Sequence, residues 1–113
     1  MNILLTDLKF NVTKLSLGDN KVIVSYTGKS DVSDIILELE IQAEPNVNFK
    51  KEDGTLVSHI RIKNELTDDI CTQAQQVIIN VSQKLPDQTP VIFNLFAQKG
   101  TPDQQERCEI IYF

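Results

Sequence analysis

His59 is the only histidine of this 113-residue chain, so any chemistry that needs an imidazole would depend on it. It lies in the alternating segment 55–63, on the opposite parity from Ile60 and Ile62. That position favours an exposed or interface side chain over a catalytic base buried beside a nucleophile. We therefore predict no catalytic residue and no enzymatic activity.

Other groups that could do chemistry also lack the required spacing. Cys71 and Cys108 form no zinc pattern with His59, because structural zinc sites need three or four closely spaced ligands. Glu38 and Glu40 lie two apart on a predicted strand and share a face, as an acidic catalytic or calcium site would require. A solvated sheet face explains them better, and the nearby DVSD lacks the glycine and final glutamate of a calcium loop. We predict no metal and no cofactor.

The charge balance bears on the class of partner. Sixteen acidic against eleven basic residues give a net charge of −5, and the densest basic group is Lys50-Lys51. Nucleic-acid binding needs clustered cations, so a nucleic-acid partner is not predicted. No apolar run reaches the roughly 18 residues of a membrane span, and the N-terminus does not resemble a signal peptide. A cytoplasmic protein with reduced cysteines and no membrane partner is expected.

The hydrophobic pattern predicts one α+β domain, residues 1–113. Leu37, Leu39 and Ile41 alternate with polar residues in 35–43, which is the clearest strand signal. The connection 44–54 ends in an Asp53-Gly54 turn signal. Predicted strands are 2–17 (with a bulge near Thr13-Lys14), 21–27, 35–43, 55–63, 90–96 and 106–113, with a helix at 64–86. About four strands would form an antiparallel sheet under one long helix, with two further C-terminal strands.

The helix prediction depends on capping and on helical spacing. Thr67 suits an N-cap, and Asp68 and Asp69 suit the positive end of a helix dipole. Apolar residues then recur at helical intervals and would form one stripe. They are Ile70, Ala74, Val77, Ile78, Val81 and Leu85.

The C-terminal strands are apolar on both faces, which raises the question of what covers the second face. PVIFNLF, residues 90–96, and CEIIYF, residues 108–113, have apolar side chains on both parities. A helix of about 18 residues is about 27 Å long and covers only one face of a sheet. A partner surface is the favoured interpretation, since exposing several large apolar side chains is unfavourable in a monomer. The alternative is a sheet that curls over itself to close a core.

The predicted helix at 67–85 followed by LPDQTPVIFNLF, residues 85–96, resembles SecB-like export chaperones. In that family an apolar segment preceded by proline follows the main helix. The resemblance implies a four-stranded antiparallel sheet with a packed helix, assembly into oligomers, and apolar grooves that hold extended chains. This sequence departs from the family at its C-terminus, where a final strand replaces a second helix and an acidic tail.

The sequence thus predicts a non-enzymatic, oligomeric protein-binding module that holds an extended polypeptide or partner protein. Its predicted contact residues are Val77, Ile78, Val91, Phe93, Leu95, Phe96, Ile111 and Phe113. The alternative is a small structural or assembly subunit, for example of a virion, or an acidic inhibitor that blocks a partner. The strand that reaches Phe113 could then add to the edge of another chain.

Overall fold

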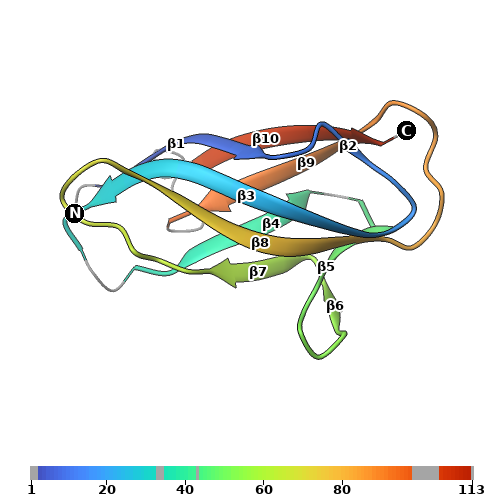
Figure 1. Ribbon diagram of the computed structural model, residues 1–113, viewed down its shortest axis with the longest axis horizontal. Coiled ribbons are helices and arrows are strands. Elements are labelled where there is room, and N and C mark those ends of the chain that lie inside the picture. Colours follow the sequence, from blue (N-terminus) through green and yellow to red (C-terminus); the bar gives the residue numbers. More distant parts are fainter. Residues whose placement is uncertain (1–2, 33–34, 43, 98–104, 113) are drawn as a thin grey trace.

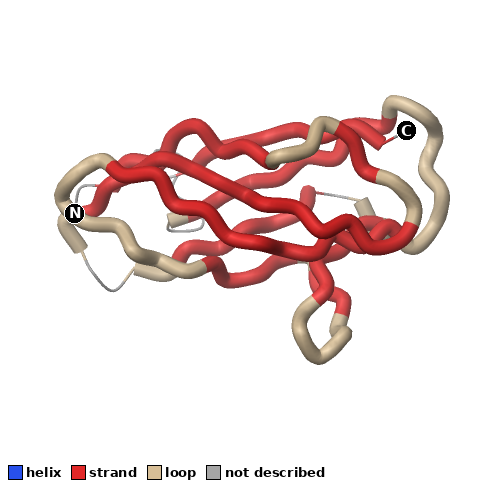
Figure 2. Tube along the Cα trace, viewed as in Figure 1, coloured by secondary structure: helices blue, strands red, loops and turns tan. Residues whose placement is uncertain are grey.

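Two β-sheets make up the structure, a computed structural model that describes residues 3–32, 35–42, 44–97 and 105–112 (Figures 1 and 2). The strands are β1 Ile3–Phe10, β2 Lys14–Leu15, β3 Gly18–Ser30, β4 Leu37–Gln42, β5 Val47–Lys50, β6 Leu56–Val57, β7 His59–Ile62, β8 Cys71–Val81, β9 Thr89–Phe96 and β10 Gln105–Tyr112. The described residues contain no helix, and hence none long and apolar enough to cross a membrane.

The first sheet has the strand order β1-β3-β8-β5-β6, and the second has the order β2-β10-β9-β4-β7. Neighbouring strands are antiparallel except β2 and β10, which are parallel. The N-terminal strand is divided between the sheets, because β1 pairs in the first and β2 in the second. The sheets pack face to face as a sandwich (Figure 1).

Aromatic side chains from both sheets meet at the centre of the core. The ring centroid of Phe93, on β9, lies 4.6 Å from that of Phe10 and 6.0 Å from that of Phe49. Val91 and Leu95 lie on the same parity of β9 as Phe93, and all three are fully buried. The inner face of the 90–96 segment is therefore covered by the first sheet of the same chain.

The α+β prediction is wrong, because residues 71–81 form the strand β8 and not part of a helix. Val77, Ile79 and Val81 alternate and are buried, whereas Ile70, which began the predicted stripe, is 63% exposed. Val77 and Val81 fit both a 3.6 and a 2.0 period, and the β-branched side chains of this run favour the pleated surface. β8 pairs with β3 along its whole length, from Gly28↔Cys71 to Gly18↔Val81. The long amphipathic helix and the single sheet beneath it are thus replaced by a second sheet.

Two local features also differ from the expectation. The irregularity in the first strand lies between Thr6 and Lys9, with Asp7 at φ 54°, and not near Thr13-Lys14. The connection 44–54 contains the strand β5, whose Val47 and Phe49 are buried. The Asp53-Gly54 turn is confirmed: Gly54 has φ +87° and its amide donates to the Lys51 carbonyl over 2.9 Å. The β5–β6 hairpin protrudes from the sandwich, as Figure 1 shows.

Candidate functional site

The structure separates the predicted contact residues. Four of them are buried between the sheets, three are half-buried, and one lies outside the described residues. The buried residues are Val77, Val91, Phe93 and Leu95, and the half-buried ones are Ile78, Phe96 and Ile111. The residue outside the described ranges is Phe113. Phe96 and Ile111 lie near opposite ends of the β9–β10 pair, since Phe96 faces Gln105 and Ile111 faces Pro90. The pair Val77 and Ile78, by contrast, lines a surface groove.

His59, Glu38 and Glu40 lie on the outer face of the second sheet. His59 faces Glu40 across the β4–β7 pair, and Arg61 faces Glu38. Of these two pairs, Arg61 and Glu38 carry opposite charges, and such a pair directly across antiparallel strands stabilises the pairing by a few tenths of a kcal/mol up to about 1 kcal/mol. This arrangement accounts for the two glutamates structurally. In the described ranges no group of three or more His, Cys, Asp or Glu side chains could hold a metal ion.

Both cysteines are free and partly buried, Cys71 on β8 and Cys108 on β10. Burial raises the pKa of the Cys108 thiol, with a smaller contribution from Glu106 and Glu109. A thiol whose charged form is disfavoured is a poor nucleophile. Cys108 is thus a half-buried side chain that packs against the core.

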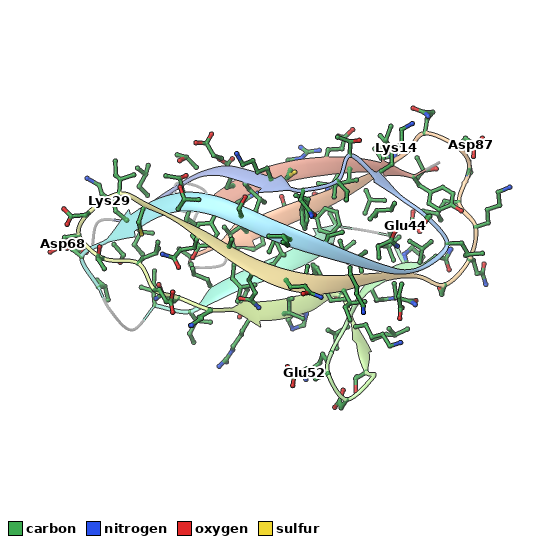
Figure 3. All side chains as sticks on the ribbon, in the orientation of Figure 1. Lys14, Lys29, Glu44, Glu52, Asp68 and Asp87 are labelled. Atoms are coloured by element: carbon green, nitrogen blue, oxygen red, sulfur yellow. The ribbon has the colours of Figure 1, made fainter. Side chains whose placement is uncertain are left out.

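A groove of about 780 Å³ runs along the side of the sandwich, where an edge of each sheet faces the same space. Its walls are the end of β5 with the hairpin turn, the β6–β7 segment, and the second half of β8. The lining residues are Lys50, Lys51, Glu52, Val57, His59, Ile60, Arg61, Gln75, Gln76, Val77 and Ile78. Figure 1 shows β7 below β8 and the hairpin at one end, and Figure 3 labels Glu52 on that hairpin. Known ligand pockets have similar volumes, about 300–1,000 Å³.

The β8 wall of the groove is an open strand edge. β3 pairs with all of β8 on one side, but on the other side β5 pairs only with residues 79–81. Ser82 N donates to Asn46 O over 2.9 Å, so the backbone groups of alternate residues before it point to the β5 side. These residues include Gln76 and Ala74. Ile23, the β3 partner of Gln76, forms its backbone hydrogen bonds with Asn11, on the side of β3 away from β8. Gln76 therefore does not bond to β3 through its backbone, which agrees with its pointing into the groove.

The open edge ends where the neighbouring strands leave the sheet. β5 diverges after Phe49, and its hairpin closes through Lys51 N, which donates to Thr55 O over 2.9 Å. The returning strand then crosses to the second sheet, where Ile41 N donates to Ser58 O over 2.9 Å. At the other end Lys63 N donates to the Gln75 side chain over 2.9 Å. The hairpin and residue 63 therefore bound the groove at its two ends.

The groove combines an uncharged strand with a basic rim. β8, CTQAQQVIINV, has no charged residue and no proline, which are common means by which proteins protect exposed edges from pairing. Lys50 forms an ion pair with Asp19 at 2.9 Å, and hydrogen bonds from Asn80 and Lys50 lower the pKa of Asp19. Lys51 and Arg61 are exposed and form no salt bridge within the described ranges. Glu52 is the one acidic side chain among the lining residues, so basic residues outnumber acidic ones on the rim of an acidic protein.

Sequence reasoning identified Val77 and Ile78 but missed the polar residues that define this groove. Lys51, Arg61 and Gln76 look like ordinary solvated residues in the sequence, and only the strand pairing brings them together. A usable signal was present in the charge-free, β-branched run of residues 71–81. Such a run is unusual for an edge strand and typical of a strand that is paired on both sides.

No protein-family model and no curated protein matches this chain. Among solved structures, a similar chain is that of Pseudomonas fluorescens alkylpurine DNA glycosylase AlkC bound to DNA containing an abasic site analog. The TM-score is 0.48 with 11% sequence identity, over 97% of this chain and 30% of that chain. The chain therefore spans less than a third of the length of that protein, and a likeness at this level supports no inference about function.

Proposed function

We propose that this protein is a non-enzymatic binding module that holds an extended segment of a partner protein by adding it as a strand to the open edge of β8. The observation on which the proposal depends is that none of the described strands pairs with the groove side of β8 before residue 79, beside a groove of about 780 Å³. A strand added there would continue the line of β5 and extend the β8 ladder past residue 79. In strand addition the backbone hydrogen bonds provide affinity and alternate side-chain pockets provide specificity.

The lining of the groove suggests the composition of the segment. Val57, Ile60 and Val77 offer apolar surface to one face of an added strand. Lys51 and Arg61 lie on the rim, so acidic side chains on the segment would meet opposite charge. The partner segment is therefore extended, apolar at alternate positions, and acidic. A cytoplasmic location belongs to the same proposal and is supported by two free cysteines in one small domain.

The homo-oligomer predicted from the sequence stays a prediction, and only an oligomer formed through the β8 edge would compete with the partner segment. Two copies paired through β8 would bring Lys51 and Arg61 of both chains toward one groove, which favours an acidic partner segment over a second copy. Light scattering over a concentration series measures the native mass against the 12.8 kDa of one chain. If an oligomer forms and dissociates in the variant Gln76→Pro, the occupant of the β8 edge is a second copy of this chain and not a partner segment.

The test is selection of binding segments from a displayed library of random ten-residue peptides, with the variant Gln76→Pro as a comparison. Proline at residue 76 removes an amide that points into the groove and not toward β3, so the fold should tolerate it. We expect enriched acidic, alternating segments that bind Gln76→Pro at least about tenfold more weakly, the effect of a lost hydrogen bond plus the proline ring. Thermal unfolding of both proteins checks that the variant is folded.

A matched pair of charge reversals completes this test. Arg61→Glu reverses a charge that lines the groove, whereas Arg107→Glu reverses the charge of an exposed β10 residue that does not line the groove. Arg61→Glu should weaken binding of the acidic segments and reduce its salt dependence, and Arg107→Glu should do neither. The proposal is wrong if no segment is enriched, or if the enriched segments bind Gln76→Pro as well as the unchanged protein.

A further inference from the structure

A small pocket adjoins the groove at the end nearer residue 63. Its volume is about 70 Å³, and Gln75 lines both the pocket and the groove. The pocket is lined by Val24, Tyr26, Ile62, Lys63, Glu65, Gln73, Ala74 and Gln75. This is room for at least one water or a side chain of similar size. A segment added to β8 would therefore pass the mouth of this pocket.

The Tyr26 hydroxyl gives the pocket an unmet hydrogen-bonding requirement. Tyr26 is only 3% exposed, and within the described part of the chain its hydroxyl has no hydrogen-bond partner. A buried polar group without a partner costs about 1–3 kcal/mol in folding free energy, so such groups are rare. A guest that reached the end of the Tyr26 ring would give this hydroxyl a partner.

Hydrogen bonds already made by the lining residues limit the chemistry of the guest. Gln73 donates to the Cys71 sulfur over 3.3 Å, which leaves its side-chain oxygen as an acceptor. Gln75 accepts from Lys63 N over 2.9 Å, which leaves its side-chain NH₂ as a donor. Together with Tyr26, which can donate or accept, these groups suit a guest that both donates and accepts a hydrogen bond.

The charges on the pocket lining favour a neutral guest. Lys63 and Glu65 both line the pocket, and they form an ion pair with each other at 2.5 Å. A guest anion would meet the Glu65 carboxylate, and a guest cation would meet the Lys63 ammonium. A small neutral hydroxyl is thus the group that meets the volume, the hydrogen-bonding pattern and the charge of the site.

Side chains on a strand added to β8 would point in a direction that brings one of them to the pocket. Residues directly opposite one another on antiparallel strands project to the same face of the sheet. Gln75 and Val77 are on the inward parity of β8, since Val77 is buried and pairs with buried Val22. The residue of the segment opposite Gln75 would therefore project inward, beside the pocket.

We infer that the Tyr26 pocket receives the hydroxyl of a serine or threonine, from the inward-facing position of the bound segment opposite Gln75. This inference depends on the proposed function and defines its specificity. An acidic, alternating segment with one serine or threonine at that position is the ligand class that the groove and the pocket together would recognise.

The experiment compares threonine with valine, which has nearly the same shape but no hydroxyl, at each position of a peptide selected on the unchanged protein. We expect one position at which the threonine peptide binds about 3- to 10-fold more tightly, the effect of one buried hydrogen bond. In the variant Tyr26→Phe this preference should fall to about 1-fold, so that the threonine peptide binds about as weakly as the valine peptide.

The outcomes separate this inference from the proposed function. Absence of a threonine preference at every position, or a preference that is unchanged in Tyr26→Phe, would overturn the pocket assignment and leave strand addition intact. Peptides that bind Gln76→Pro as well as the unchanged protein would instead overturn strand addition, and the pocket assignment with it. Tyr26→Phe should fold normally, because it removes a hydroxyl that has no partner in the free protein.

Discussion

Replacement of Phe93 by alanine is expected to lower the free energy of unfolding by about 3–5 kcal/mol. Phe93 is fully buried and contacts Phe10 and Phe49, which come from different strands of the opposite sheet. Its removal would leave a cavity where the two sheets meet, and close packing on both sides limits the collapse that could fill it. Urea denaturation followed by circular dichroism measures the loss.

Phe96→Ala is the matched control, because Phe96 is the same residue type on the same strand but half-buried on the outer face. Its loss should be clearly smaller than that of Phe93→Ala. A domain of this size is stabilised by only about 5–15 kcal/mol, so Phe93→Leu is the fallback if the alanine variant does not fold. Equal losses at the two positions would contradict the sandwich, since they would mean that the inner face of β9 is no better covered than the outer.

The strands were predictable where one face is core and the other is solvent. In β4 the residues Leu37, Leu39 and Ile41 alternate with Glu38 and Glu40, and only a half-buried strand produces that pattern. β9 was also located correctly, although its outer parity includes Ile92, which is half-buried. Because β9 has apolar side chains on both faces, the sequence suggested that one face needs a partner protein. The inner face is in fact covered by the other sheet of the same chain.

β8 could not be assigned because its neighbours decide its conformation. Val77 and Ile78 fit a helical stripe as well as Val77, Ile79 and Val81 fit a strand, and Thr67 resembles a helix cap. In the structure the Thr67 carbonyl instead accepts from Ser30 N over 2.8 Å. The partner strand β3 lies about 50 residues earlier in the chain, and such non-local pairing is not visible in local propensity.

The groove was unpredictable for a related reason. It exists because β5 is only four residues long and pairs with one end of β8. β5 itself was missed, since Val47 and Phe49 lie in a connection rich in polar residues and too short for a clear alternating pattern. The length of a neighbour decides whether an edge is open, and sequence alone does not give the register that fixes it.

Alkaline pH is expected to destabilise this protein through Tyr26. Burial, with a smaller effect from nearby Cys71 and Glu65, raises the pKa of Tyr26 from 10.0 to about 12. The unfolded chain then releases the phenol proton more easily than the folded one. The contribution of the neutral Tyr26 to the free energy of unfolding is therefore fully present below pH 10 and is lost as the pH rises through about 12. A difference of about two pKa units corresponds to about 2–3 kcal/mol.

The measurement is urea denaturation of the unchanged protein and Tyr26→Phe at pH values from about 8 to 12. Lysines and cysteines also ionise in this range, but they do so in both proteins, so the difference between the two curves isolates Tyr26. The unchanged protein should lose about 2–3 kcal/mol more than the variant across this range. Parallel curves would mean that burial does not hold the Tyr26 phenol in its neutral form, and the assignment of a buried Tyr26 hydroxyl to the pocket would then be wrong.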